Sequence, residues 1–273
     1  MRNSRGIQTK MYIIREMHVR VLALAVAASL VLAAGCGGIF GHEYEYEEQL
    51  YLSVDGSASI VIDSSVPALV ALRGVPIHSA PGAGFDPQEV RRLYEAAGCH
   101  VVSVGQPWFR HGRRFIQVQV ATPDVRTLAA CAPLAWSTYR LDRLANEVEY
   151  RQQVGGAAGG NPGPVNWTGG ELVAFKLHLP SKITFHNVRR LLDNAPGEPG
   201  RGNILTWEQR LTDRRAGVPI DMHVKMEPQS ILYRTLWLFG GSFLAAVVVL
   251  AALIWWTVRK GRRRVARARS MGQ

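Results

Sequence analysis

The sequence predicts an α+β domain built on a largely antiparallel sheet, with two or three packed helices. Stretches of alternating polar and apolar residues, typical of half-buried strands, dominate residues 43–227. Helical patterns are few, and they do not alternate regularly with the strands as they would in a parallel α/β sheet. The same stretch is long enough for one well-buried core. We therefore expect a single α+β domain over residues 43–227.

The first predicted element is a strand over residues 42–54. Asp55-Gly56 is a two-residue hairpin signal, and residues 58–62 return as the partner strand. The first strand also carries several acidic residues, which could form a cation site. Like charges spaced by two residues point together into water, so we interpret them instead as a solvated strand face. These residues are Glu43, Glu45, Glu47 and Glu48.

Three helices are predicted, over residues 65–74, 86–98 and 124–131. The second has the strongest start, because Asp86 can cap it and Pro87 suits the first helical position. The remaining alternating stretches are predicted strands, over residues 99–104, 114–122, 139–154 (a pair), 172–179, 183–185, 204–211 and 220–226.

Residues 155–170 contain seven glycines and two prolines and are predicted to form a flexible loop.

Two apolar segments lie outside the domain. Residues 21–34 are too short to span a bilayer and read as the core of a signal peptide over residues 1–35, with Met17 as an alternative start. Residues 236–258 carry no charge and predict a transmembrane helix. Residues 36–42 would form a tether.

The charge pattern predicts topology and argues against nucleic-acid binding. The chain has a formal net charge of +11. Residues 1–35 contribute +4 and residues 259–273 contribute +7, so residues 36–258 are neutral. Basic flanks of apolar segments stay cytoplasmic, which places the tail, residues 259–273, inside and the domain outside the cell membrane. A neutral domain gives no electrostatic support for binding DNA or RNA.

The three cysteines have different predicted roles. Residues 32–38 read Leu-Ala-Ala-Gly-Cys-Gly-Gly and resemble a bacterial lipobox, so we expect lipidation at Cys36; the alternative is ordinary cleavage that leaves this cysteine unmodified. Cys99 and Cys131 are then a natural disulfide pair in an oxidising compartment. The alternative is two buried thiols.

No pattern for catalysis, a cofactor or a metal stands out, so we expect a protein that is not an enzyme. The serines lack a nucleophile-elbow context, and no glycine-rich loop joins a strand to a helix as a phosphate site needs. One cluster combines aromatic and basic residues, which suits a membrane headgroup zone. It could equally be a loop anchored on the core with solvated arginines. Its members are Trp108, Phe109, Arg110, Arg113 and Arg114.

The end of the domain carries a short pattern, which is a strand that ends at proline (172–180), then Asn187, then a strand that contains a tryptophan (203–207). This pattern resembles that of LppM-like domains. It implies a membrane-anchored bacterial envelope lipoprotein with an α+β domain and a C-terminal membrane helix, and no catalytic residues come with it.

Two functions remain open at this stage. The domain could bind a lipid or glycolipid near the bilayer, or it could be a structural or assembly module that docks another envelope protein. A continuous apolar cavity between sheet and helices would favour lipid binding. A filled core with an exposed apolar patch would favour docking.

Overall fold

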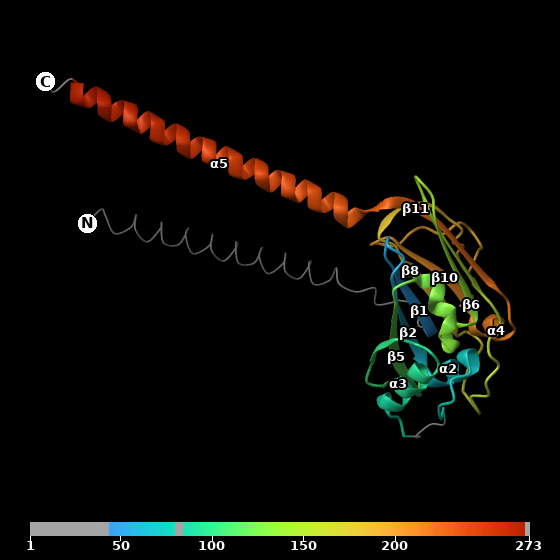
Figure 1. The fold of residues 1–273 in the computed structure, drawn as a ribbon. Coiled ribbons are helices and arrows are strands. Elements are labelled where there is room, and N and C mark those ends of the chain that lie inside the picture. The colour runs from blue at the N-terminus through green and yellow to red at the C-terminus, as the bar shows by residue number, and fades with distance from the viewer. Residues whose placement is uncertain (1–43, 80–83, 271–273) are drawn as a thin grey trace, which may run out of the picture. The chain divides into compact units, whose positions relative to one another are not determined.

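The computed structural model describes residues 44–79 and 84–270 (Figure 1). The predicted signal peptide, Cys36 and the tether lie outside the described residues. The strands are β1 (Tyr44–Leu52), β2 (Ala58–Ser65), β3 (Val101–Val104), β4 (Trp108–Arg110), β5 (Arg113–Thr122), β6 (Ser137–Arg143), β7 (Val148–Val154), β8 (Leu172–His178), β9 (Ser181–His186), β10 (Ile204–Arg210) and β11 (Ile220–Ser230). The helices are α2 (Val66–Arg73), α3 (Pro87–Ala96), the 3-10 helices η1 (Val125–Ala130) and η2 (Ala132–Leu134), α4 (Leu211–Arg215) and α5 (Ile231–Ser270).

The predicted α+β class is confirmed, and the strands form two sheets. Sheet A has the order β10-β8-β1-β2-β5-β3, with β4 added along β5. Sheet B has the order β6-β7-β11-β9. Pairing is antiparallel throughout, except that β1 runs parallel to β8 in sheet A. Sheet A combines strands from residues 44–122 with strands from residues 172–210, so long-range pairing decides its architecture (Figure 1).

The helix starts follow local capping. Ser65 accepts a hydrogen bond from the Ala68 backbone N–H (3.2 Å) at the start of α2. Asp86 does the same for Gln88 at α3 (2.9 Å). The third predicted helix is instead a 3-10 helix, η1, which Asp124 caps. It is followed at once by η2 and Pro133, and a chain that must turn so soon cannot continue α-helical hydrogen bonding.

The core fills the space between the two sheets with apolar side chains. Leu50, Ile60 and Val118 of sheet A and Tyr150 and Val224 of sheet B are all almost fully buried. The sheets also meet through polar groups, because the side-chain amide of Gln152 on β7 donates a hydrogen bond to the Glu48 carboxylate on β1 (3.3 Å).

The interpretation of β1 as a strand with a solvated acidic face is wrong at two positions. Glu45 is 3% exposed and Glu48 is 2% exposed. Glu48 lies on the same face as Tyr46 and Leu50, which is the face that turns to the core. Both carboxylates form ion pairs with arginines, as buried charges require.

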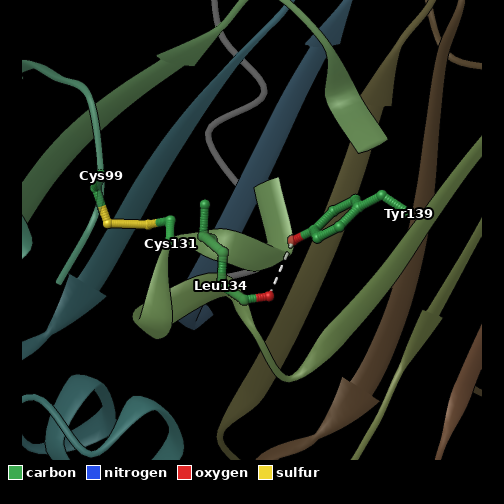
Figure 2. Close-up of a disulfide and its surroundings, with 4 residues drawn as sticks. All are labelled: Cys99, Cys131, Leu134 and Tyr139. Atoms are coloured by element: carbon green, nitrogen blue, oxygen red, sulfur yellow. Dashed lines mark hydrogen bonds between the residues drawn. A yellow bond between two sulfur atoms is a disulfide. The ribbon is translucent and has the colours of Figure 1, made fainter. Parts of the chain in front are cut away.

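A disulfide joins Cys99, just after α3, to Cys131, between η1 and η2 (Figure 2). The Cα atoms lie 4.6 Å apart, within the range that a bridge needs. Beside it, the Tyr139 hydroxyl donates to the Leu134 carbonyl (3.5 Å). The bridge closes a loop of 32 residues. In the chain-entropy model such a loop stabilises the fold by roughly 3–4 kcal/mol.

The glycine-rich residues 155–170 pack closely against the domain. The Gly155 N–H donates to the Trp136 carbonyl (2.7 Å), and the Ala158 N–H donates to the Leu72 carbonyl (2.9 Å). A Cβ added at Gly160 would come within 2.2 Å of the Val70 carbonyl oxygen. Glycine is therefore needed at position 160 for close approach to α2, and not only for chain flexibility.

The last helix, α5, begins directly after β11. The described residues contain one helix that is long and apolar enough to cross a bilayer by length and composition, over Ile231–Thr257. This span starts five residues before the predicted one, because β11 continues to Ser230 and leaves no linker between strand and helix. Its length and composition are consistent with membrane association.

Candidate functional site

The aromatic and basic cluster predicted from the sequence lies on the hairpin of β4 and β5. The two strands are joined by His111 and Gly112, whose φ angles of 50° and 72° are both positive, as in the two-residue turns that match strand twist. Trp108 pairs with Phe115, and Arg110 pairs with Arg113. The sequence predicts a loop at this point and gives no sign of β4, because a three-residue strand is too short to show alternation.

Along the hairpin, aromatic rings contact one another and are also contacted by guanidinium groups. The Trp108 ring stacks on Phe115 at 5.8 Å between centroids. The Arg110 guanidinium lies 4.3 Å from the Phe115 ring centre. Arg114 lies 5.3 Å from the ring centre of Phe109, which is itself 67% exposed. Such cation–π contacts hold each guanidinium group against its ring, while the exposed part of Phe109 stays in water.

Glu45 ties the hairpin to the rest of the domain. Its carboxylate accepts hydrogen bonds from Arg113 of β5 (2.8 Å) and from the Ser65 hydroxyl at the start of α2 (2.6 Å). It also accepts one from the Trp167 indole N–H (3.2 Å) in the glycine-rich segment. Arg113 in turn donates to the Asn166 carbonyl (3.1 Å). One buried carboxylate therefore fixes the distance between the hairpin and residues 166–167.

Two hollows lie between the hairpin and residues 164–171, and they share His111, Arg113 and Asn166 as lining residues. The first has a volume of 210 Å³, and Phe109 and Arg114 also line it. The second, of 580 Å³, is also lined by several charged side chains, which are Glu45, Arg110 and Glu171. We call the two together the hairpin cleft.

Two arginines of the cleft, Arg110 and Arg114, form no ion pair with any residue that the structure describes. Within the described residues, Arg114 forms no ion pair, and its contacts are with the rings of Phe85 and Phe109. The Arg110 Nε is buried and contacts no acceptor in the part of the chain that the structure describes. Guanidinium groups bind carboxylate and phosphate oxygens well, so the cleft can take an anionic group.

The structure brings together most of the predicted cluster. Phe109, Arg110, Arg113 and Arg114 line the hairpin cleft, and Trp108 supports it from behind through Phe115. The sequence did not predict the opposite wall of the cleft, which includes Glu45, Val66, Pro67, His78, Ser79 and residues of the segment 164–171. Nothing in a single sequence shows that residue 166 faces residue 113, so no local signal could have found this wall.

The other predicted site residues lie elsewhere. Cys99 and Cys131 form the disulfide beside α3 and line neither hollow of the cleft. Among residues 44–79 and 84–270, no group of three or more His, Cys, Asp or Glu side chains could hold a metal ion.

The fold and the cleft define an α+β domain that carries an arginine-lined surface cleft and continues into one apolar helix. No family model matches the chain, and no curated protein matches it. Among solved structures, the chain is distantly similar to the NMR structure of the folded domain of LppM from Mycobacterium tuberculosis. The identity is 12%, the TM-score is 0.36, and the match covers 70% of this chain and 94% of the LppM domain.

Proposed function

We propose that this protein is a membrane-anchored envelope lipoprotein whose exported domain binds the anionic headgroup of a lipid or glycolipid in the hairpin cleft. The domain would lie on the extracytoplasmic side of the cell membrane. α5 would form the single membrane span, and lipidated Cys36 the second anchor. Its role is binding, without catalysis and without a cofactor.

The observation that carries the proposal is Arg114 beside Phe109. Among the described residues this arginine has no carboxylate partner, and the ring next to it is 67% exposed. Paired basic and aromatic side chains at a surface suit the headgroup zone, where the cation contacts a phosphate and the ring contacts the apolar boundary. Arg110 adds further positive charge along the same cleft, whereas Glu45 balances the charge of Arg113.

The size and composition of the cleft favour a headgroup over acyl chains. The two hollows, of 210 and 580 Å³, mix charged and apolar lining residues and open to the surface. Acyl chains would need a continuous apolar cavity, whereas the core between the sheets is filled by buried side chains. The proposal therefore restricts the contact to the headgroup.

The test is a lipid titration of the full chain in a nonionic detergent. We expect short-chain phosphatidylglycerol to bind more tightly than phosphatidylcholine of the same chain length, as measured by tryptophan fluorescence. Arg114→Ala should weaken phosphatidylglycerol binding about tenfold or more, since a charge-assisted contact contributes about 1.5–3 kcal/mol. Mass spectrometry of lipids that co-purify with the chain from its host would identify the natural headgroup.

Arg92→Ala is the matched control, because Arg92 is an arginine of α3 whose side chain is 70% exposed and lies outside the cleft. It should leave the affinity unchanged. Equal affinity for the two lipids, or equal losses in the two variants, would contradict the proposal.

The filled core favours the alternative function, docking of another envelope protein, with the exposed Phe109 as a contact. A photo-crosslinking amino acid placed at position 109 of the full chain in its host separates the two functions. Lipid adducts support headgroup binding, whereas one dominant protein adduct supports docking.

A further inference from the structure

A second group of cations lies inside the domain, around Trp136. This residue lies between η2 and β6 and is half-buried. The guanidinium carbon of Arg73, the last residue of α2, is 3.3 Å from the Trp136 ring centre. That of Arg214, on α4, is 5.3 Å away. The two arginines are 7% and 0% exposed. We call these three residues the Trp136 cluster.

The cluster has more positive than negative charge. Arg73 forms an ion pair with Glu48 and donates from Nε to the Tyr46 hydroxyl (2.8 Å). Arg214 donates to the Gly155 carbonyl and has no carboxylate partner among the described residues. Two guanidinium groups and one carboxylate leave a net charge of +1 in the interior.

The unused hydrogen-bonding groups of the cluster are all donors. Arg73 Nη1, Arg214 Nε, Arg214 Nη1 and Trp136 Nε1 are buried and contact no acceptor in the described part of the chain. None of these nitrogens can accept a hydrogen bond. A group that satisfies them must supply acceptors, and the surplus positive charge favours an anionic one.

Arg214 cannot escape this cost by losing its proton at neutral pH. Burial, and then the positive charge of Arg73, lower the pKa of Arg214 to about 10. The guanidinium therefore stays charged at neutral pH, in a place where an unpaired charge is unfavourable.

We propose that the Trp136 cluster is a binding site for a small anion, which it holds through carboxylate or phosphate oxygens with Arg214 as the main contact. The site is separate from the hairpin cleft, since neither hollow of the cleft is lined by Arg73, Trp136 or Arg214. Trp136 itself is only half-buried, so part of the cluster reaches the surface.

The test is thermal unfolding of the full chain in a nonionic detergent, with sodium phosphate or sodium acetate replacing sodium chloride at constant ionic strength. We expect a saturable rise of the midpoint by about 2–4 °C or more, since a ligand that binds only the folded state stabilises it. Phosphate acting alone indicates a phosphate site, and acetate acting alone indicates a carboxylate site.

Arg214→Met removes the buried charge and keeps an unbranched side chain. In chloride this variant should unfold at the wild-type temperature or above, because an unpaired buried charge is gone. The rise of its midpoint with phosphate and acetate should fall to the part that binding in the hairpin cleft supplies. Arg114→Ala, which removes the unpaired arginine of the hairpin cleft, should keep the part of the anion effect that Arg214→Met abolishes. Lipid titration with Arg114→Ala tests headgroup binding in the hairpin cleft, and the anion effect with Arg214→Met tests the Trp136 cluster, so the two proposals can fail separately.

Three results would overturn the proposal. The first is a wild-type midpoint that neither phosphate nor acetate raises beyond chloride. The second is an anion effect that is as large in Arg214→Met as in the wild type, or that disappears in Arg114→Ala. The third result is used if Arg214→Met does not fold. In that case, phosphate and labelled acetate are titrated onto the wild-type chain and followed by phosphorus and carbon NMR, and the absence of saturable binding would overturn the proposal.

Discussion

Strand β1 carries two buried glutamates, three positions apart, whose surroundings differ. Glu48 faces the core, and its arginine partner Arg73 has a fully buried side chain. Glu45 faces the other side of sheet A, and the side chain of its partner Arg113 is 13% exposed and lines the hairpin cleft. Nearly equal burial thus accompanies two roles. The enclosed pair joins α2 to sheet A inside the core. The pair beside the cleft instead fixes the position of a surface that can meet a ligand.

The largest effect should come from breaking the enclosed pair. Glu48→Ala leaves Arg73 buried without a carboxylate and should lower the free energy of unfolding by about 3–5 kcal/mol. Denaturant titration of the full chain in detergent measures it. Glu95→Ala, which breaks an exposed pair with Arg91 on α3, should cost less than about 1 kcal/mol.

A double variant sharpens this result. Glu48→Leu combined with Arg73→Met replaces both charges by apolar groups, so it should regain most of the stability that Glu48→Ala loses. If the double variant is as unstable as the single one, the enclosed pair contributes more than the mutual neutralisation of two buried charges.

A smaller effect is expected beside the cleft. Glu45→Gln keeps the shape but weakens the hydrogen bonds from Arg113, Ser65 and Trp167, and should lower the free energy of unfolding by about 1–3 kcal/mol. Glu45→Gln should also increase the hydrogen-exchange rate of residues 164–171, because Glu45 bonds Trp167 in that segment. The Glu48–Arg73 pair makes no such bond. Glu47→Gln is the control, because Glu47 and its partner Lys176 line neither hollow of the cleft. Equal exchange in both variants would remove the proposed role of Glu45.

The smallest effect concerns His178, whose ring stacks on Tyr51 of β1 at 4.0 Å. Burial, and then the charge of Lys176, lower the pKa of His178 below its usual value. Protonation is therefore less favourable in the folded than in the unfolded chain. The contribution of His178 to stability is complete above the unfolded pKa of about 6.5 and is lost as the pH falls below it.

NMR titration of His178 should give a midpoint below that of an unfolded histidine. His178→Phe should keep the stacking and reduce the loss of stability between neutral and mildly acidic pH. A variant that retains the whole pH dependence would assign it to other groups.

Local signals in the sequence predicted much of the fold. The Asp86 cap and Pro87 marked the start of α3 to the residue, and Asp55-Gly56 marked the turn between β1 and β2, because capping and turn geometry depend on a few adjacent residues. Cys99 and Cys131, which the sequence pairs as a natural disulfide, also form one in the structure. Local signals did not find α4, since five residues are too few for a periodic pattern.

The sequence by itself determined the α+β class, most strand positions and the apolar helix, because alternation, turn chemistry and length are local properties. Only the tertiary structure decided that Glu45 and Glu48 are buried. Alternation along β1 assigns residues to two faces but does not say what covers each face. Arg73, Arg113 and Gln152 reach these carboxylates from 25, 68 and 104 residues away, and those pairings exist only once both sheets have formed.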